Sequence, residues 1–100
     1  MDFDVHHGNG TQAILETNPN LFYASTHQEA PFYPGTGHAH ETGVGNILNC
    51  PLPEGTDGSL FRKEMEEKVL PALAAFNPDL LMISAGFDAH HADPRAGLNW

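Results

Sequence analysis

Two carboxylates and an imidazole alternate near the start of the sequence, at Asp2, Asp4 and His6. If residues 2–6 form a strand, its two-residue period turns these three side chains to one face. The phenylalanine and valine between them then point to the opposite, apolar side. Three such polar groups on one side of a short strand are costly unless a cation or hydrogen-bond partners compensate them. The pattern therefore predicts a metal centre.

A further carboxylate, Asp88, follows a continuous apolar run at residues 80–85. Such a run is typical of a central parallel strand that is buried on both faces. Because ligands bind beyond the carboxyl ends of parallel strands, Asp4, His6 and Asp88 are expected to lie together. Catalytic zinc takes three protein ligands of these types and leaves one position for water or substrate. On spacing alone one alternative stays open, in which the aspartates cap turns and His6 is a core histidine.

The rest of the chain must position these residues, and its pattern alternates strands with helices. Between strands at residues 1–5 and 80–85, we expect a helix at 10–16, strands at 21–26 and 46–52, and a helix at 60–76. The first helix has Thr11 as its expected N-cap and the second has Asp57 or Ser59. Pro71 should kink the second helix or restart it as a further segment. This order indicates an α/β architecture with a largely parallel sheet.

Composition limits the size, the partners and the compartment. The 100 residues form at most one small domain or a piece of a larger one. A formal net charge of −9 argues against nucleic acid and anionic membranes as partners. No apolar stretch approaches the ~20 residues of a membrane span and no signal peptide is recognised, so the expected compartment is the cytoplasm. The single cysteine, Cys50, excludes an intramolecular disulfide and is expected to be buried.

Six of the seven histidines fall in three close pairs along the sequence. Strand alternation places His7 on the face opposite His6, so we interpret His7 as a buried hydrogen-bonding partner rather than a general base. The other two pairs lie in stretches expected to be loops: His38, His40, His90 and His91.

Three motifs follow one another along the chain: Asp-x-Asp-x-His-His-Gly-Asn-Gly-Thr-Gln at residues 2–12, Pro-Phe-Tyr-Pro-Gly-Thr-Gly at 31–37, and Ser-Ala-Gly-Phe-Asp-Ala-His-x-x-Asp-Pro at 84–94. Together they resemble the zinc-dependent histone deacetylase superfamily, which includes acetoin-utilisation proteins and acetylpolyamine amidohydrolases. The resemblance covers essentially the whole chain. It implies a three-layer arginase/deacetylase-like α/β fold with a mostly parallel sheet. Residues 1–100 would then be the central fragment of a single catalytic domain.

The resemblance also assigns roles at the metal centre. Asp4, His6 and Asp88 match the zinc ligands of the family. Tyr33, or else Phe32, matches an aromatic wall of the narrow channel that takes an acyl-lysine-like chain.

A monovalent cation, typically potassium, is implied beside the zinc. Asp2 matches an aspartate that helps to bind this cation and also orients one histidine of a proton-transfer pair, while Asn9 stands where the family supports the other histidine. Ser25 matches the second side-chain ligand of the cation. Backbone carbonyls would complete the site, those of Asp4, His6 and Thr26. A second cation site, if present, would use only backbone carbonyls around residues 15–21.

Part of the catalytic machinery of the family has no counterpart in residues 1–100. In relatives the tandem histidines that act as general base and acid precede the first motif, and a tyrosine that polarises the substrate carbonyl follows the last. We therefore expect zinc binding without positioned proton transfer, which typically contributes ~10²–10⁴ in rate. Unpaired sheet edges are expected as well.

The motifs and the composition are compatible with three functions. The leading one is a zinc-dependent amidohydrolase that removes acetyl groups from acetyl-lysine or acetylated amines by means of a metal-activated water. The second is a non-catalytic metal-binding or self-associating fragment, with a homo-oligomer covering the exposed sheet edges. The third is a ureohydrolase related to arginase, which uses two manganese ions. His6 and the Gly-Asn-Gly after it favour the single-metal pattern over the third.

Overall fold

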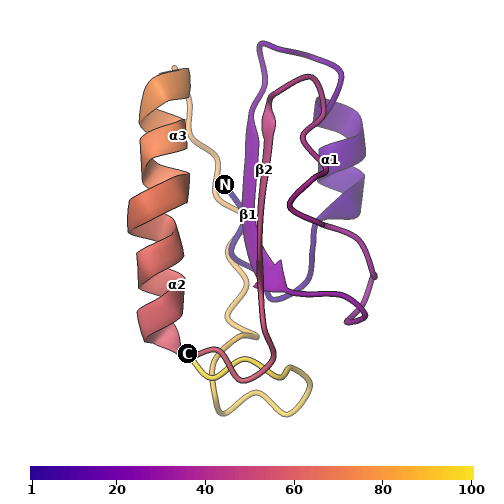
Figure 1. The fold of residues 1–100 in the computed structure, drawn as a ribbon, viewed down its shortest axis with the longest axis vertical. Coiled ribbons are helices and arrows are strands. Elements are labelled where there is room, and N and C mark those ends of the chain that lie inside the picture. Colours follow the sequence, from indigo (N-terminus) through magenta and orange to yellow (C-terminus); the bar gives the residue numbers. More distant parts are fainter.

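A parallel pair of strands forms the centre of the computed structural model, which describes residues 1–100. Strands β1 (Tyr23–Gln28) and β2 (Ile47–Leu52) pair in register, with Tyr23 opposite Ile47 and Gln28 opposite Leu52. Helix α1 (Asn9–Leu15) lies on one side of this sheet and a long helical column lies on the other (Figure 1). The expected α/β architecture is confirmed, with helices on both faces of a parallel sheet.

The long column consists of three helical segments in direct succession: α2 (Gly58–Glu64), the π-helix η1 (Met65–Val69) and α3 (Leu70–Phe76). Asp57 is the N-cap, and its carboxylate accepts hydrogen bonds from the backbone N–H groups of Ser59 and Leu60. Pro71 lies in the first turn of the new segment α3, so the helix restarts there as one of the two expected outcomes. The turn just before it is a π-turn, in which the Leu70 N–H bonds to the Met65 carbonyl. A wider turn gives the proline ring room that an α-turn denies it.

Residues 1–5 and 80–85 are not strands, so both of these predictions are wrong. Each segment contributes only isolated parallel bridges, in which Asp2 pairs with Ser25 on one side and with Ser84 on the other. The Asp2 N–H donates to the Ala24 carbonyl (2.8 Å) and the Phe3 N–H donates to the Ser84 carbonyl (3.1 Å). The spatial order is therefore β2, β1, residue 2, residue 84, with all segments parallel.

The apolar run before Ser84 is exposed, although the sequence predicts a strand buried on both faces. Leu80 and Met82 are each 75% exposed, and Ile83 is 52% exposed. Residues 1–3 hydrogen-bond to one edge of this run, and no segment of residues 1–100 pairs with its other edge. A continuous apolar run needs a neighbour on each side to become a central strand, and this run has one.

Helix α1 begins at Asn9 with Gly8 as its N-cap, not with Thr11 as expected. A side chain has no room at Gly8, because a Cβ atom there would lie 2.7 Å from the hydroxyl of Tyr23. The Gly8 N–H donates to that same hydroxyl at 3.1 Å. Close approach of the backbone to β1 therefore decides where α1 starts.

Two small clusters of buried side chains make up the core. Ala24, Cys50 and Val69 pack between the sheet and the long helical column. The second cluster lies at the end of the sheet near the metal-binding motif and contains Val5, Leu52, Ala89 and Leu98. Cys50 is buried as expected. No helix combines the length and the apolar character that crossing a membrane would require.

Candidate metal centre

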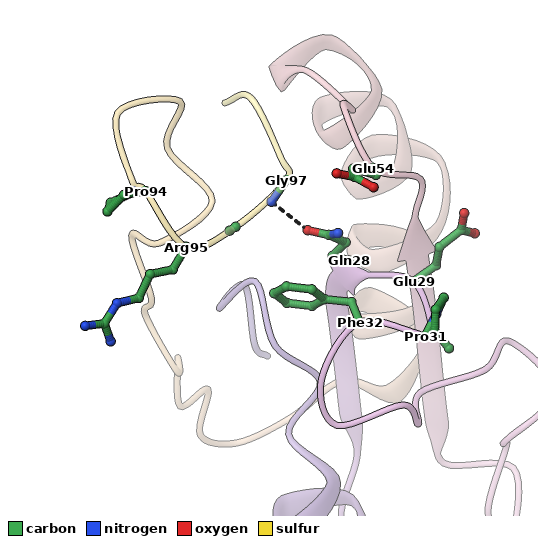
Figure 2. Close-up of a pocket in the computed structure, with 10 residues that line it drawn as sticks. Gln28, Glu29, Pro31, Phe32, Glu54, Pro94, Arg95 and Gly97 are labelled. Atoms are coloured by element: carbon green, nitrogen blue, oxygen red, sulfur yellow. Dashed lines mark hydrogen bonds between the residues drawn. The ribbon is translucent and has the colours of Figure 1, made fainter.

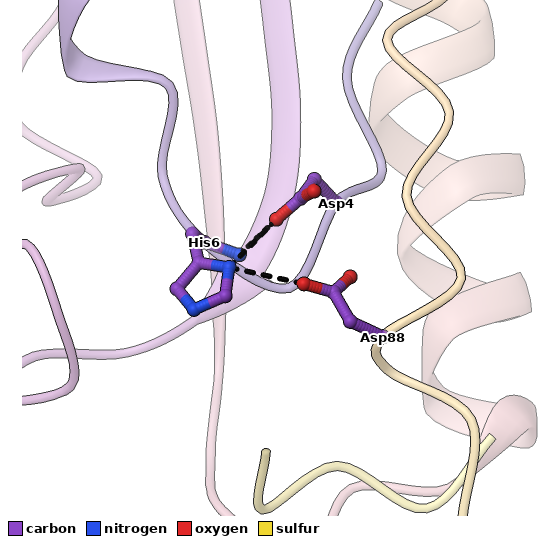
Figure 3. A group of neighbouring side chains, drawn as sticks. All are labelled: Asp4, His6 and Asp88. Atoms are coloured by element: carbon purple, nitrogen blue, oxygen red, sulfur yellow. Dashed lines mark hydrogen bonds and ion pairs between the residues drawn. The ribbon is translucent and has the colours of Figure 1, made fainter. Parts of the chain in front are cut away.

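Asp4, His6 and Asp88 converge on one point, as the sequence predicts. One ligand atom from each of the three residues lies within 4.8 Å of the other two. The Nδ1 atom of His6 is 2.9 Å from an oxygen of Asp4 and 3.0 Å from an oxygen of Asp88 (Figure 3). Residues separated by more than eighty positions in the sequence therefore present an imidazole nitrogen and two carboxylates to the same space.

Turns, not strand alternation, bring the first two of these side chains together. The Asp4 N–H donates to the carboxylate of Asp2 at 3.1 Å, and the His6 N–H donates to the carboxylate of Asp4 at 2.8 Å. Each aspartate thus bonds to the backbone two residues further on, which is the usual way in which this side chain stabilises a turn. Asp2 does not belong to the metal-binding group and is buried.

The core holds the ligands in place from below. Val5 lies between the two N-terminal ligands and is fully buried, and Ala89, which follows Asp88, is fully buried in the same cluster. The Val5 N–H donates to Asp88 at 3.0 Å, so one carboxylate oxygen of Asp88 is fixed while the other faces His6. The buried neighbours and this hydrogen bond anchor the backbone around the ligands. The ligand side chains themselves are partly exposed, at 25–41%.

Aromatic rings flank the centre on one side. The ring of Phe32 stacks on the imidazole of His6, with centroids 5.1 Å apart and planes at 22°. Tyr33 meets the same imidazole edge-on at 6.3 Å, and its side chain is 77% exposed. The two residues that the family resemblance places in the substrate channel therefore both contact a candidate ligand.

A cavity of about 470 Å³ lies beside Phe32, between the end of β1 and the loop at residues 93–97 (Figure 2). The Gly97 N–H donates to the side chain of Gln28 at 2.9 Å, and both residues line the cavity. Glu29 and Glu54 line it, and the side chain of Arg95 points away from both (Figure 2). The surface next to the aromatic rings is thus rich in carboxylates.

Asp2 and Ser25, the two side chains assigned to a monovalent cation, are adjacent and buried. They form a parallel bridge, and Asp2 is 5% exposed while Ser25 is 0% exposed. Burial raises the pKa of the Asp2 carboxyl, although hydrogen bonds from the Asp4 N–H and the Tyr23 hydroxyl oppose that rise. The hydroxyl of Ser25 bonds to Nδ1 of His27 at 2.9 Å. Thr26 is also fully buried in the next position of β1.

His27 is a buried polar residue that sequence analysis overlooked. Its Nε2 bonds to the carbonyl of Gly37 at 2.8 Å, so this nitrogen carries the proton and Nδ1 accepts from Ser25. Burial lowers the pKa of His27 to about 4, and the hydrogen bond to Gly37 only partly opposes this. Strand period gives the missed signal, since Tyr23, Ser25 and His27 alternate along β1 and share one face.

The expected role of His7 as a buried hydrogen-bonding partner is confirmed. His7 is 3% exposed, its Nδ1 bonds to the hydroxyl of Thr36 at 2.7 Å and its Nε2 bonds to the side chain of Gln12 at 2.8 Å. Both ring nitrogens are therefore engaged away from the metal-binding atoms. Asn9, by contrast, is exposed at the start of α1 and its side chain makes no hydrogen bond within residues 1–100.

The other histidine pairs lie in loops, as expected, and do not join the metal-binding group. The rings of His38 and His40 stack at 5.3 Å, and those of His90 and His91 lie 4.2 Å apart. All four residues are exposed.

The donor atoms of this group fit a zinc ion. Zinc binds imidazole nitrogen and carboxylate oxygen, and catalytic zinc sites combine three protein ligands with one open position. Asp4, His6 and Asp88 are the one group of three or more such side chains that the structure brings together. A two-metal centre of the ureohydrolase kind would need further bridging carboxylates in this group.

Comparisons with known proteins identify relatives of this chain. The sequence model of the histone deacetylase domain matches residues 1–100. The uncharacterized protein slr0245 of Synechocystis sp. is 54% identical over 100 residues, which cover 99% of this chain and 33% of that protein. Histone deacetylase 10, chloroplastic, of Oryza sativa subsp. japonica is 47% identical over 104 residues, which cover 100% of this chain and 23% of that protein.

A solved structure extends the similarity to the fold. The acetylpolyamine aminohydrolase from Burkholderia pseudomallei superposes with a TM-score of 0.92 at 34% identity, covering 98% of this chain and 30% of that one. The chain thus spans a third or less of the length of these relatives, and the expectation of part of a deacetylase-like α/β domain is confirmed. Since the family model matches every residue from 1 to 100, the chain belongs to the histone deacetylase family.

Proposed function

We propose that this chain carries the metal centre of a zinc-dependent amidohydrolase that removes acetyl groups from acetyl-lysine or acetylated amines. The observation that carries the proposal is the convergence of Asp4, His6 and Asp88 within 4.8 Å. Family membership supports the reaction class, and the solved acetylpolyamine aminohydrolase supports acetylated amines as substrates.

Some residues of this chain would hold the metal, and others would shape the access of substrate to it. Zinc bound to the three ligands would acidify a water molecule and polarise a substrate carbonyl. The Val5 N–H fixes the orientation of Asp88, and the turn hydrogen bonds fix Asp4 and His6. Phe32 covers one face of the His6 imidazole, so it would exclude water from that side and pack against an apolar acyl chain.

Proton transfer requires groups other than the buried histidines. Both ring nitrogens of His7 are hydrogen-bonded to neighbouring side chains, and those of His27 bond to Ser25 and Gly37. Neither histidine can accept a proton from a metal-bound water in this arrangement. We propose that residues outside 1–100 supply the proton-transfer histidines and the tyrosine, with Asp2 and Asn9 as supports for that pair.

A monovalent cation, with potassium the ion expected, fits beside Asp2 and Ser25. Asp2 is a buried carboxylate whose pKa is raised by burial, and it has no ion-pair partner within 4 Å. Hydrogen bonds from the Asp4 N–H and the Tyr23 hydroxyl stabilise this carboxylate but carry no full positive charge, which a cation here would supply. The carbonyls of Asp4, His6 and Thr26 are the proposed remaining ligands.

Self-association is the alternative that one specific observation favours. The apolar run at residues 80–83 is exposed and has one unpaired edge, with Leu80 and Met82 each 75% exposed. Exposed apolar edges of this kind pair readily with other strands. We propose that a homo-oligomer covers this run when the chain is studied by itself.

A chimera tests the proposed function directly. Residues 1–100 replace the matching segment of the Burkholderia pseudomallei acetylpolyamine aminohydrolase, and the product is assayed with an acetylated polyamine and an acetyl-lysine peptide. We expect zinc-dependent deacetylation of at least one substrate. The same chimera carrying Asp88→Asn should lose that activity, whereas His90→Ala, an exposed loop variant, should retain it. A folded, zinc-loaded chimera without activity on either substrate would overturn the proposal.

A further inference from the structure

Three backbone carbonyls beyond the end of α1 converge on the side chain of Asn46. The Nδ2 atom of Asn46 lies 2.9 Å from the carbonyl oxygens of Leu15, Asn18 and Leu21. Leu15 is the last residue of α1, where carbonyls lack partners within the helix, and the other two lie in the turns that follow. Asn46 is 4% exposed, so these contacts are shielded from water.

The orientation of this amide is fixed by its partners. Its oxygen accepts a hydrogen bond from the Val44 N–H at 3.2 Å, and the three carbonyls can only accept, so the nitrogen must face them. An amide NH₂ has two hydrogens, so it can donate at most two hydrogen bonds of good geometry. Three carbonyl oxygens lie at equal distance from it. The three oxygens therefore form a cradle, made by the carbonyls of residues 15, 18 and 21, that surrounds one point with negative partial charge.

Such a cradle is the kind of site that holds a monovalent cation, because carbonyl oxygens can replace the hydration shell of potassium. It coincides with the region around residues 15–21 where the family resemblance allows a second cation. In this chain a side-chain nitrogen already stands at the centre of the oxygens. The residues present therefore do not fit a second ion.

We propose that the amide of Asn46 takes the place of a monovalent cation in the carbonyl cradle. The amide holds the turns after α1 against the start of β2, and the chain binds no ion at this position. Gly43 makes room for it, since a Cβ atom there would lie 2.6 Å from the amide oxygen of Asn46. Shortening residue 46 opens a latent potassium site. This inference does not depend on the metal centre.

The test measures how potassium affects unfolding of the full 100-residue chain. Wild type, Asn46→Ala and Asn49→Ala are unfolded by urea in potassium chloride and in tetramethylammonium chloride at equal ionic strength. Asn49 is the matched control, because it is a buried asparagine of β2 whose Nδ2 bonds to the Gln12 side chain at 2.8 Å. We expect potassium to stabilise Asn46→Ala more than wild type. The slope of the logarithm of the folding equilibrium constant against the logarithm of the potassium concentration should be larger by up to about one. Asn49→Ala should keep the wild-type slope.

The variant Asn46→Asp and the binding of thallium(I) test the proposal independently of Asn46→Ala unfolding. Asn46→Asp places a carboxylate oxygen against the three carbonyls, so this variant should depend on potassium at least as strongly. If either variant is unfolded in tetramethylammonium, recovery of its helical circular dichroism on adding potassium is the expected result, and failure to recover contradicts the proposal. Thallium(I), a potassium substitute, should give an anomalous diffraction peak at the cradle in crystals of Asn46→Ala and Asn46→Asp but not of wild type. A thallium peak there in wild type, or equal potassium slopes for Asn46→Ala and Asn49→Ala, would overturn it.

Discussion

Gly8 lies where the chain leaves the metal-binding turn and enters α1. A Cβ atom on Gly8 would lie 2.7 Å from the Tyr23 hydroxyl and 2.8 Å from the Asp2 carboxylate. We expect Gly8→Ala to lower the free energy of unfolding by about 1–3 kcal/mol, as over-packing does. Gly10→Ala is the matched control, because nothing lies within 4 Å of a Cβ there and alanine is favoured inside a helix by roughly 0.5–1 kcal/mol. Urea unfolding compares the two, and equal stabilities would contradict the close approach.

His27 should make folding sensitive to acid. Burial lowers its pKa from 6.5 to about 4, so between these values the unfolded chain binds more protons than the folded chain. Its contribution to stability is therefore complete above about pH 6.5 and is lost as the pH falls toward 4, by roughly 3 kcal/mol at most.

The measurement for His27 compares urea unfolding at pH 7 and pH 4.5. His27→Gln should show a smaller loss of stability between the two pH values than wild type does. His40→Gln, which alters an exposed loop histidine, should follow wild type. A pH dependence that is the same in wild type and His27→Gln would show that another group is responsible.

At the residue level the sequence predicted the grouping of Asp4, His6 and Asp88 but not its cause. Strand alternation would place Asp2 on the same face as Asp4 and His6. Instead, the carboxylates of Asp2 and Asp4 accept turn hydrogen bonds from the backbone N–H groups two residues further on, and Asp2 is buried. His27 was missed because the predicted strand ended at residue 26, although Tyr23, Ser25 and His27 alternate along β1. Only its hydrogen bond to the carbonyl of Gly37, ten residues away, has no local signal in the sequence.

Among the elements, the long helical column depends on one cap. The carboxylate of Asp57 accepts hydrogen bonds from the N–H groups of Ser59 and Leu60. We expect Asp57→Ala to lower the free energy of unfolding by about 1 kcal/mol, the usual cost of losing an N-cap. Ser59→Ala removes only a hydroxyl that donates to Asp57, so its effect should be smaller. If Ser59→Ala destabilises the chain more than Asp57→Ala in thermal unfolding, Asp57 is not the residue that caps the helix.

Helices could be predicted here better than strands. The long helical column is predicted by features of the local sequence: the spacing of its apolar residues, the Asp57 cap, and Asn77-Pro78 at its end. Whether residues 80–85 become a strand depends instead on a partner along each edge, and only residues 1–3 supply one. Sequence pattern reports the apolar character of that run but cannot report which neighbours cover it.

For the molecule as a whole, the exposed run at residues 80–83 should govern association. Leu80→Lys combined with Met82→Lys replaces two side chains that are each 75% exposed, so it should reduce self-association with little change in folding. Ile14→Lys is the control, because Ile14 on α1 is 76% exposed but lies outside this run. Analytical ultracentrifugation of the three proteins measures the effect. Equal association of all three would exclude the run as the contact surface.

Zinc binding by the chain tests the central claim most directly. Equilibrium dialysis followed by elemental analysis should find one zinc per wild-type chain, since one group of three ligands is present. Asp88→Asn and His6→Ala should lose bound zinc, while circular dichroism shows that both remain folded. His90→Ala should retain it. Absence of zinc from a folded wild-type chain, or unchanged zinc binding in Asp88→Asn and His6→Ala, would contradict the assignment of the metal centre.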